Sequence, residues 1–333
     1  MWAVLKAPAV RTAIRIGLFL AGLGILVRLV IQLDLNEIVR LVARTGWQFL
    51  ALLVIYAGCQ AARAAALWLC QPQVEMVPYR EVLAVRVSAE AVRVATFAGS
   101  LVAEPSKVWL LGRRGLKTNE GIAAIIAELV THSVIACAVS IPALGYLVSR
   151  FELGPFLHVT VVVLIWAMGL YALVAVVAVW FRLHLIGRGV RLLMRLGLPK
   201  FERNEVRLME DLLLRVLRER PGRLALILAC QAGANLFLML EIFVALRAME
   251  VGIPTHYAFL IEGSVKFIGV AFFFIPTQIG VSEGAMAILF TSLGLPATAG
   301  VSLAFIRRLR TLGAAAVGLA AITVLGSGPV KGS

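Results

Sequence analysis

The sequence is poor in charged residues and poorest in aspartate. Charged residues make up 15% of its 333 residues, and only two of them are aspartates, Asp34 and Asp211, both at the polar ends of apolar stretches. Intramembrane transferases that act on lipid or isoprenoid substrates generally need Asp-rich metal-diphosphate motifs or a His/Asp pair. Two isolated aspartates cannot supply such a motif. We therefore expect no enzyme of this kind, with no catalytic residue, no metal site and no cofactor.

Cysteine is also scarce, and its spacing is uninformative. The four cysteines form no C-x-x-C pair, and each lies in or at the end of an apolar segment: Cys59, Cys70, Cys137 and Cys230. Free cysteine in apolar surroundings behaves as a small buried hydrophobe. The pattern therefore indicates neither a redox motif nor a zinc site.

Apolar residues dominate what remains. They account for 61% of the chain, and the mean hydropathy is +0.95, whereas soluble domains are near half apolar and a quarter charged. A bilayer core requires about 20 apolar residues per helix. Six stretches meet that length: 14–33, 47–69, 121–148, 157–181, 223–246 and 298–326. The sequence predicts an all-α, multi-pass membrane protein of about six spanning helices.

The net charge of +14 is concentrated in particular loops. Between Arg182 and Arg223 there are eleven basic residues against five acidic ones. Basic loops stay cytoplasmic, and no nucleic-acid recognition motif accompanies the charge. We therefore expect no nucleic-acid partner, an inner-membrane protein with both termini cytoplasmic, and a basic amphipathic segment at 182–222 on the cytoplasmic surface. Arg113, Arg114 and Lys117 are predicted to anchor the chain at the interface.

Two further regions cannot be ordinary spans. Residues 79–114 are too charged, and 257–295 is interrupted at Pro276 and Gly280. Irregular backbone at membrane depth is tolerated where it is buried in protein or lines a wet cavity. Both regions are predicted to be broken helical hairpins, either re-entrant or built of two full spans. This gives eight or more membrane segments in all.

These regions also resemble each other. When Glu104 is aligned with Glu283, Gly115-Leu116 falls on Gly294-Leu295, and Gly121 on Gly300. Cys-Gln-Ala occurs in both preceding helices. The chain is predicted to be a single membrane domain built of two repeats, 1–150 and 151–333. Three spans separate the copies, so their topologies are inverted, an architecture of transporters that work by alternating access.

Charged residues inside the membrane are costly and mark candidate sites. Glu104 before Pro105, and Ser282 before Glu283, are predicted to start half-helices, with Pro105 in the first position and Ser282 as the cap. Two functions stay open for these ends: stabilising the helix starts, or facing an anionic headgroup from opposite sides. The predicted substrate-binding residues are Glu104, Lys107, Ser282, Glu283, Arg307 and Arg308. Secondary candidates are Arg63, Glu90, Arg93, Glu128, Glu262 and Lys266.

Two groups of these residues have structural alternatives. Arg307 and Arg308 can pair with Glu283 or Glu262, or they can contact phosphate, which the planar fork of arginine suits. Glu128 and His132 stand four apart on one helix face. Because the sequence has no second ligand pair of this kind, the spacing favours a satisfied polar pair over a proton relay or half of a metal site.

The segment 96–111, TFAGSLVAEPSKVWLL, and the run 276–284, PTQIGVSEG, followed by Gly294 and Arg307-Arg308, resemble the two signatures of the flippase-like family named for the transmembrane region of lysylphosphatidylglycerol synthases. The resemblance covers most of the chain and implies movement of a lipid or lipid-linked group between leaflets. Ala103-Glu104-Pro105 stands where the first signature would have Gly-Glu, so the exact role of Glu104 does not carry over. The family includes stand-alone members that are linked to hopanoid pathways, and the resemblance implies that this chain could belong to that branch.

The sequence thus predicts a lipid flippase whose partners are membrane lipids with an anionic headgroup. The alternative is a non-transporting scaffold or accessory subunit for lipid-biosynthetic enzymes. A scaffold would tolerate loss of the intramembrane charges, whereas a flippase would not.

Overall fold

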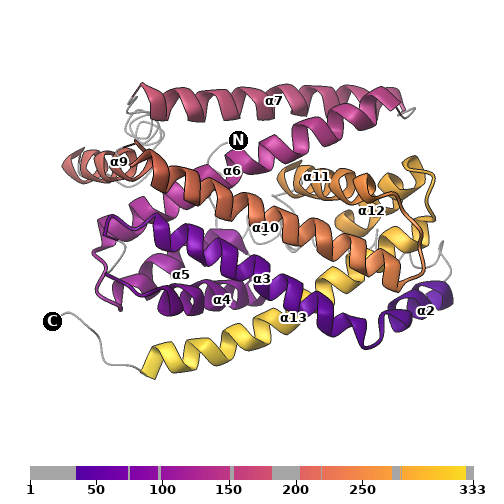
Figure 1. Cartoon of the computed structure of the whole chain (residues 1–333), viewed down its shortest axis with the longest axis horizontal. Coiled ribbons are helices and arrows are strands. Elements are labelled where there is room, and N and C mark those ends of the chain that lie inside the picture. The colour runs from indigo at the N-terminus through magenta and orange to yellow at the C-terminus, as the bar shows by residue number, and fades with distance from the viewer. Residues whose placement is uncertain are drawn as a thin grey trace, which may run out of the picture.

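The structure is a computed structural model, and it describes residues 35–73, 76–96, 99–150, 154–181, 203–218, 220–271, 278 and 280–327. Every regular element in these residues is a helix, which confirms the predicted all-α class (Figure 1). The helices are α2 (Leu35–Thr45), α3 (Gln48–Leu69), α4 (Tyr79–Ala95), α5 (Ser100–Gly112), α6 (Thr118–Arg150), α7 (Pro155–Trp180), α9 (Arg203–Arg218), α10 (Pro221–Ala248), α11 (Thr255–Ala271), α12 (Val281–Ser292) and α13 (Ala297–Ser327).

Among the described helices, α3, α6, α7 and α10 are long and apolar enough to cross a membrane. Each coincides within a few residues with a predicted span, so the chain is a multi-pass membrane protein. The helix α13 covers the last predicted span but carries three arginines near its middle. The predicted span at 14–33 lies outside the described residues.

The helix α7 has the surface expected of a lipid-facing span. Trp166 and Leu170 are 76% and 62% exposed, and most of the apolar side chains along the helix are at least partly open. In Figure 1 it lies along one edge of the molecule, beside α6. Because no described residue covers its outer face, lipid is the solvent that fits it.

Each region predicted to be a hairpin contains two helices with a break. The first is α4 and α5, which meet at Gly99, and the second is α11 and α12, with Gly280 before α12. Both glycines have positive φ, +47° and +79°, a conformation that side-chain-bearing residues rarely adopt. Whether the hairpins are re-entrant or fully spanning stays a prediction.

Two shorter helices are amphipathic. The helix α9 covers most of the C-terminal half of the predicted segment 182–222, of which 182–202 and residue 219 lie outside the described residues. The helix α2 lies between the predicted spans 14–33 and 47–69, where the sequence analysis predicted no helix. Its buried residues Ile38, Leu41 and Thr45 recur at helical spacing and face the rest of the protein.

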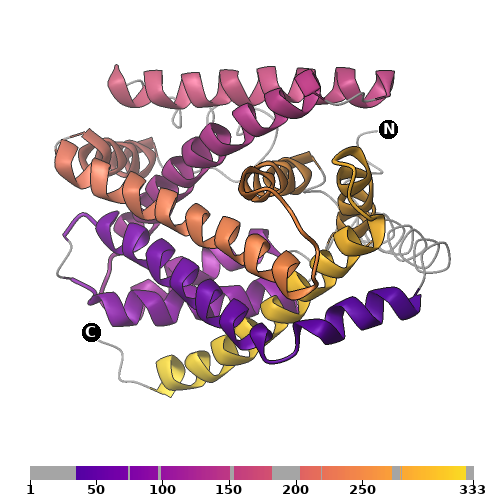
Figure 2. The ribbon, with the colours of Figure 1, turned by 45° about the vertical axis from the view of Figure 1, so that its right-hand side comes forward.

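The contacts between helices repeat in the two halves. The helix α4 packs on α13, and its counterpart α11 packs on α6; α5 packs on α6, and α12 on α13. The helix α2 contacts α13, and α9 contacts α6. The helices α3 and α10 lie side by side and run in opposite directions (Figures 1 and 2). This exchange of partners is what two inverted copies of one unit require.

A glycine lies at each of two crossings between the halves. Gly318 in α13 meets Val87 and Ala91 in α4, and Gly263 in α11 meets Ala143 and Val139 in α6. A Cβ on Gly263 would lie 3.1 Å from the Val139 carbonyl oxygen, so the backbones approach closely at both crossings.

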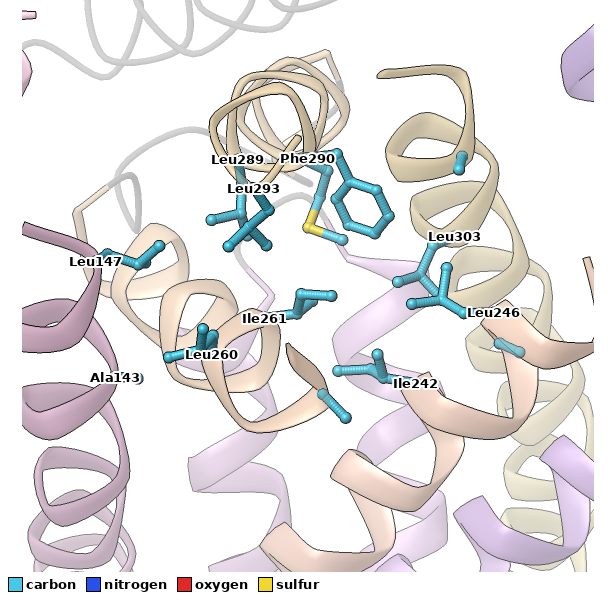
Figure 3. Close-up of a cluster of buried hydrophobic side chains, with 14 of the residues drawn as sticks. Ala143, Leu147, Ile242, Leu246, Leu260, Ile261, Leu289, Phe290, Leu293 and Leu303 are labelled. Atoms are coloured by element: carbon cyan, nitrogen blue, oxygen red, sulfur yellow. The ribbon is translucent and has the colours of Figure 1, made fainter. Parts of the chain in front are cut away.

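The largest apolar cluster joins α6 to the second half (Figure 3). Phe290 of α12 is fully buried, with Leu303 of α13 and Ile261 of α11 in the same cluster. Ile242 and Leu246 of α10 belong to the same cluster. This packing holds α11, α12 and α13 around one side of the polar cavity described next.

Candidate functional site

A cavity of about 450 Å³ lies at the centre of the bundle. Helices of both halves line it: α3, α4, α5 and α6 from the first, and α10, α11 and α13 from the second. Its charged lining residues are seven bases and four acids: Arg63, Arg86, Arg93, Lys107, Lys266, Arg307, Arg310, Glu90, Glu104, Glu128 and Glu262. Tyr56 and His132 also line it.

Glu128 of α6 organises the first-half side of the cavity. Its carboxylate accepts a hydrogen bond from the Arg86 guanidinium at 2.7 Å and one from the Lys107 ammonium at 3.2 Å. Lys107 also pairs with Glu104 at 2.9 Å. The predicted Glu128–His132 pair is absent among the described contacts, because His132 instead lies 3.3 Å from the Gln231 side-chain oxygen. A carboxylate with two cationic partners tolerates burial because its charge is neutralised in place.

A second group of the first half surrounds Glu90. Arg93 reaches it at 2.5 Å, and the Tyr56 hydroxyl donates to it at 2.9 Å. The Gln60 side-chain nitrogen donates to the Tyr56 hydroxyl at 2.8 Å, and the Gln60 side-chain oxygen accepts a hydrogen bond from Arg86 at 3.0 Å. These hydrogen bonds therefore link α3 to α4 beside the cavity.

Glu262 of α11 is the buried carboxylate that lines the second-half side of the cavity. It is 1% exposed and pairs with Lys266 at 2.9 Å and with Arg307 of α13 at 3.0 Å. This agrees with the structural alternative given for Arg307 above. Arg307 lines the cavity, and one of its Nη atoms is buried without a hydrogen-bond partner. The hydrogen-bonding capacity of this guanidinium is therefore not fully used by the described residues.

Arg308 pairs with Glu283 instead, at 2.6 Å. Glu283 is fully buried and accepts a hydrogen bond from the Gly280 backbone N–H at 2.8 Å, which secures the start of α12. Arg308 and Ser282 line a second cavity of about 490 Å³. It adjoins the central one, since Arg93, Arg307 and other residues line both.

Arg310 contacts both halves, although its ion pair lies within the second half. Its guanidinium pairs with Glu241 of α10, and its carbon lies 3.8 Å from the centre of the Tyr56 ring. A stacked guanidinium keeps its edge donors free for other partners. The Arg310 Nε is indeed buried without a hydrogen bond.

The cavity carries more positive than negative charge. Counting Glu241 with the four acids that line it, seven bases face five carboxylates. Among the described residues, Arg63 has no acidic side chain within ion-pair distance, and its Nε is buried without a hydrogen bond. An excess of guanidinium and ammonium donors in a partly enclosed space suits an anion.

The ion pairs follow the division into halves. In the part of the chain that the structure describes, each pair around the cavity joins two residues of the same half. The pair that crosses is Arg44–Glu250, which is exposed and remote from the cavity. Each half therefore neutralises its own buried carboxylates.

The structure gathers most of the predicted site residues around this cavity. Nine of them line it: Arg63, Glu90, Arg93, Glu104, Lys107, Glu128, Glu262, Lys266 and Arg307. Ser282 and Arg308 line the adjoining cavity, and the fully buried Glu283 pairs with Arg308.

The predicted helix starts are wrong in detail. The helix α5 begins at Ser100 and not at Pro105, which lies inside it, because the positive φ of Gly99 sets the break earlier. Gly280 and not Ser282 precedes α12, and the Ser282 hydroxyl donates to Glu283 at 2.8 Å. Glu104 therefore lies in the second turn of its helix, where it pairs with Lys107.

Sequence reasoning missed three residues of the site. Arg86 lies in the predicted hairpin 79–114 but was not singled out, although it shares a face of α4 with Glu90 and Arg93 at helical spacing. Tyr56 precedes Gln60 and Arg63 with the same spacing on α3, which was the available signal. The third is Arg310, which the sequence analysis left outside the proposed site.

The family model described as the lysylphosphatidylglycerol synthase TM region matches residues 13–318. No curated protein and no solved structure matches the chain.

Proposed function

The chain belongs to the lysylphosphatidylglycerol synthase transmembrane-region family, and from that premise we propose that it moves an anionic lipid, or a lipid-linked anionic group, between the leaflets of the inner membrane. The observation that carries the proposal is the central cavity, whose lining has an excess of basic side chains drawn from both halves. A headgroup enters this cavity while its hydrocarbon chains stay in the bilayer.

The placement of the ion pairs supports alternating access. Because the carboxylates around the cavity pair within their own halves, relative movement of the halves need not separate opposite charges. The contacts that cross the cavity are of a weaker kind, such as the stacking of Arg310 on Tyr56 and the 3.3 Å contact of His132 with Gln231. Such contacts can be exchanged at smaller cost than a buried ion pair.

The proposal includes the orientation and the partners expected from the sequence. Both termini are cytoplasmic, as the basic segment 182–222 favours. The substrate is a membrane lipid, and the cavity residues bind and position it without chemical conversion. Arg63 is the side chain most available to an anion, since its charge has no acidic partner among the described residues.

Dithionite quenching of fluorescent lipids in liposomes tests the proposal. Vesicles that hold the full-length protein are expected to lose fluorescence beyond the outer-leaflet share, and more for an anionic phosphatidylglycerol analogue than for phosphatidylcholine. Arg63→Gln is expected to slow anionic translocation by about tenfold, the effect of losing one charged hydrogen bond. Arg150→Gln, at the exposed end of α6, serves as the matched control.

Two results would contradict the proposal. One is the absence of protein-dependent quenching with any headgroup, which favours the scaffold alternative for a lipid-biosynthetic complex. The other is quenching that Arg63→Gln leaves unchanged, which would move the substrate away from this cavity.

A further inference from the structure

A separate groove of about 780 Å³ lies between α5 and α6. Its wall is mostly apolar and includes Val108 of α5 and Ile122, Ile125 and Ile126 of α6. The groove does not belong to the charged cavity, but the two share Glu104 and Leu129. One end of the groove therefore opens beside the proposed headgroup site.

The other end of the groove has a basic, aromatic rim. The Arg113 guanidinium lies 5.3 Å from the centre of the Trp109 ring, and Trp109 is 60% exposed. Lys117 stands in the turn before α6 and is exposed. Exposed tryptophan and basic residues at the start of a membrane helix mark the interface between headgroups and hydrocarbon. The rim therefore presents cations at the depth of lipid headgroups.

The length of the groove fits one leaflet. Along α6 it is lined from Thr118 to Leu129, a distance of about 16 Å at the helical rise. The hydrocarbon core of a bilayer is about 30 Å thick, so each leaflet contributes about half of it. The groove thus extends from the interface to about the middle of the membrane.

The equivalent position in the second half is more tightly packed. Gly300 in α13 corresponds to Gly121 in α6, and a Cβ on Gly300 would lie 2.6 Å from the Met286 carbonyl oxygen. A Cβ on Gly121 would reach its nearest neighbour, Val108, at 3.6 Å, an ordinary contact distance. Leu129 is replaced in the second half by Arg308. The two halves therefore differ in packing and in charge at this place, and the apolar surface belongs to the first.

We propose that the groove between α5 and α6 is a loading site for an anionic membrane lipid, whose headgroup lies at Arg113 and Lys117 and whose hydrocarbon chain lies along α6. The proposal deepens the proposed function and rests on it for the next step, in which the headgroup passes Glu104 into the central cavity. The apolar wall selects a hydrocarbon chain, and the basic rim selects an anion over a zwitterion.

Gly112 allows a direct test. It lines the groove, and an added Cβ there meets nothing within 4 Å, so Gly112→Phe fills the groove without a clash at Cβ. Gly145 in α6 has equally open space outside the groove and gives the control Gly145→Phe. The probe is phosphatidylglycerol with a diazirine in its acyl chain, photolysed in vesicles that contain the full-length protein, with peptide mapping of the label.

Label is expected on the peptides of residues 108–129, and Gly112→Phe is expected to reduce it about tenfold relative to labelling of α7, since overpacking excludes the chain. Gly145→Phe is expected to leave it unchanged. Replacing both Arg113 and Lys117 with Gln is expected to remove the preference over the matching phosphatidylcholine probe.

Label on α5 and α6 no denser than on exposed α7 would identify bulk lipid contact only and overturn the proposal. Label that Gly112→Phe does not alter would overturn it equally. Because labelling does not require transport, the two proposals fail separately: a labelled groove without translocation contradicts the flippase, and translocation without a labelled groove contradicts the loading site.

Discussion

A Cβ added to Gly318 in α13 would lie 2.2 Å from the carbonyl oxygen of Val87 in α4. The two helices belong to different halves, and their backbones touch where the glycine removes the side chain. This contact keeps α4 beside α13 and so fixes one side of the charged cavity.

Gly318→Ala is therefore expected to destabilise the protein by about 1–3 kcal/mol, because the carbonyl oxygen cannot rotate away as a side chain can. Gly313→Ala, in the same helix, is the control, since its Cβ would lie 3.5 Å from a Leu53 methyl group. Thermal unfolding in detergent, followed by tryptophan fluorescence, measures both. Equal melting temperatures for the two variants would show that the crossing is not as tight as the structure gives.

The buried pairs of Glu262 predict a larger effect. Glu262→Gln leaves Lys266 and Arg307 without their shared counter-charge in a buried position, which is expected to cost about 3–5 kcal/mol. Glu250→Gln breaks the exposed pair with Arg44 and is expected to cost less than about 1 kcal/mol. The same unfolding experiment compares them, and a smaller loss for Glu262→Gln than for Glu250→Gln would contradict the assigned network.

Tyr56 combines a hydrogen bond and a stacking contact that two variants can separate. Tyr56→Phe removes the hydroxyl that donates to Glu90 but keeps the ring under Arg310, with an expected loss of about 1–2 kcal/mol. Tyr56→Leu also removes the ring and is expected to cost about 1 kcal/mol more. If both variants unfold at the same temperature, the stacking on Arg310 contributes nothing to stability.

The exposed face of α7 predicts the depth of Trp166, which lies near the middle of that helix. In a variant that keeps only this tryptophan, lipids brominated deep in their acyl chains are expected to quench its fluorescence more than lipids brominated near the headgroup. Trp47, 78% exposed before α3, is the comparison, and we expect shallower quenching there. Stronger quenching of Trp166 by aqueous acrylamide than by either lipid would contradict the assignment of α7 as a span.

Long apolar runs made the spans predictable from the sequence. The helices α3, α6, α7 and α10 each contain about twenty apolar residues, and no soluble element competes with that signal. The helix α2 was missed because it is only 11 residues long and only a few of its residues are buried. Short amphipathic helices are visible in a sequence only through their periodicity.

The candidate site was predictable in its residues but not in its pairing. Intramembrane charge singled out Glu128, Glu262 and Arg307, since each is costly in lipid. Which base meets which acid depends on how α4, α5 and α6 converge, and the sequence does not contain that geometry. Arg86 shows the limit, because the sequence presents it only as one of several basic residues in the predicted hairpin 79–114, whereas in the fold it is buried against Glu128.

The confinement of each ion pair to one half has a consequence for biogenesis. When α6 leaves the ribosome, the partners of Arg86 and Glu128 have already been synthesised, and the same is true of Glu90 with Arg93. The buried carboxylates of the first half can thus enter the lipid phase with their partners in place, before the insertion machinery receives any of α9 to α13. Contacts between the halves that wait for α13 include the backbone crossing of Gly318 on α4 and the stacking of Arg310 on Tyr56.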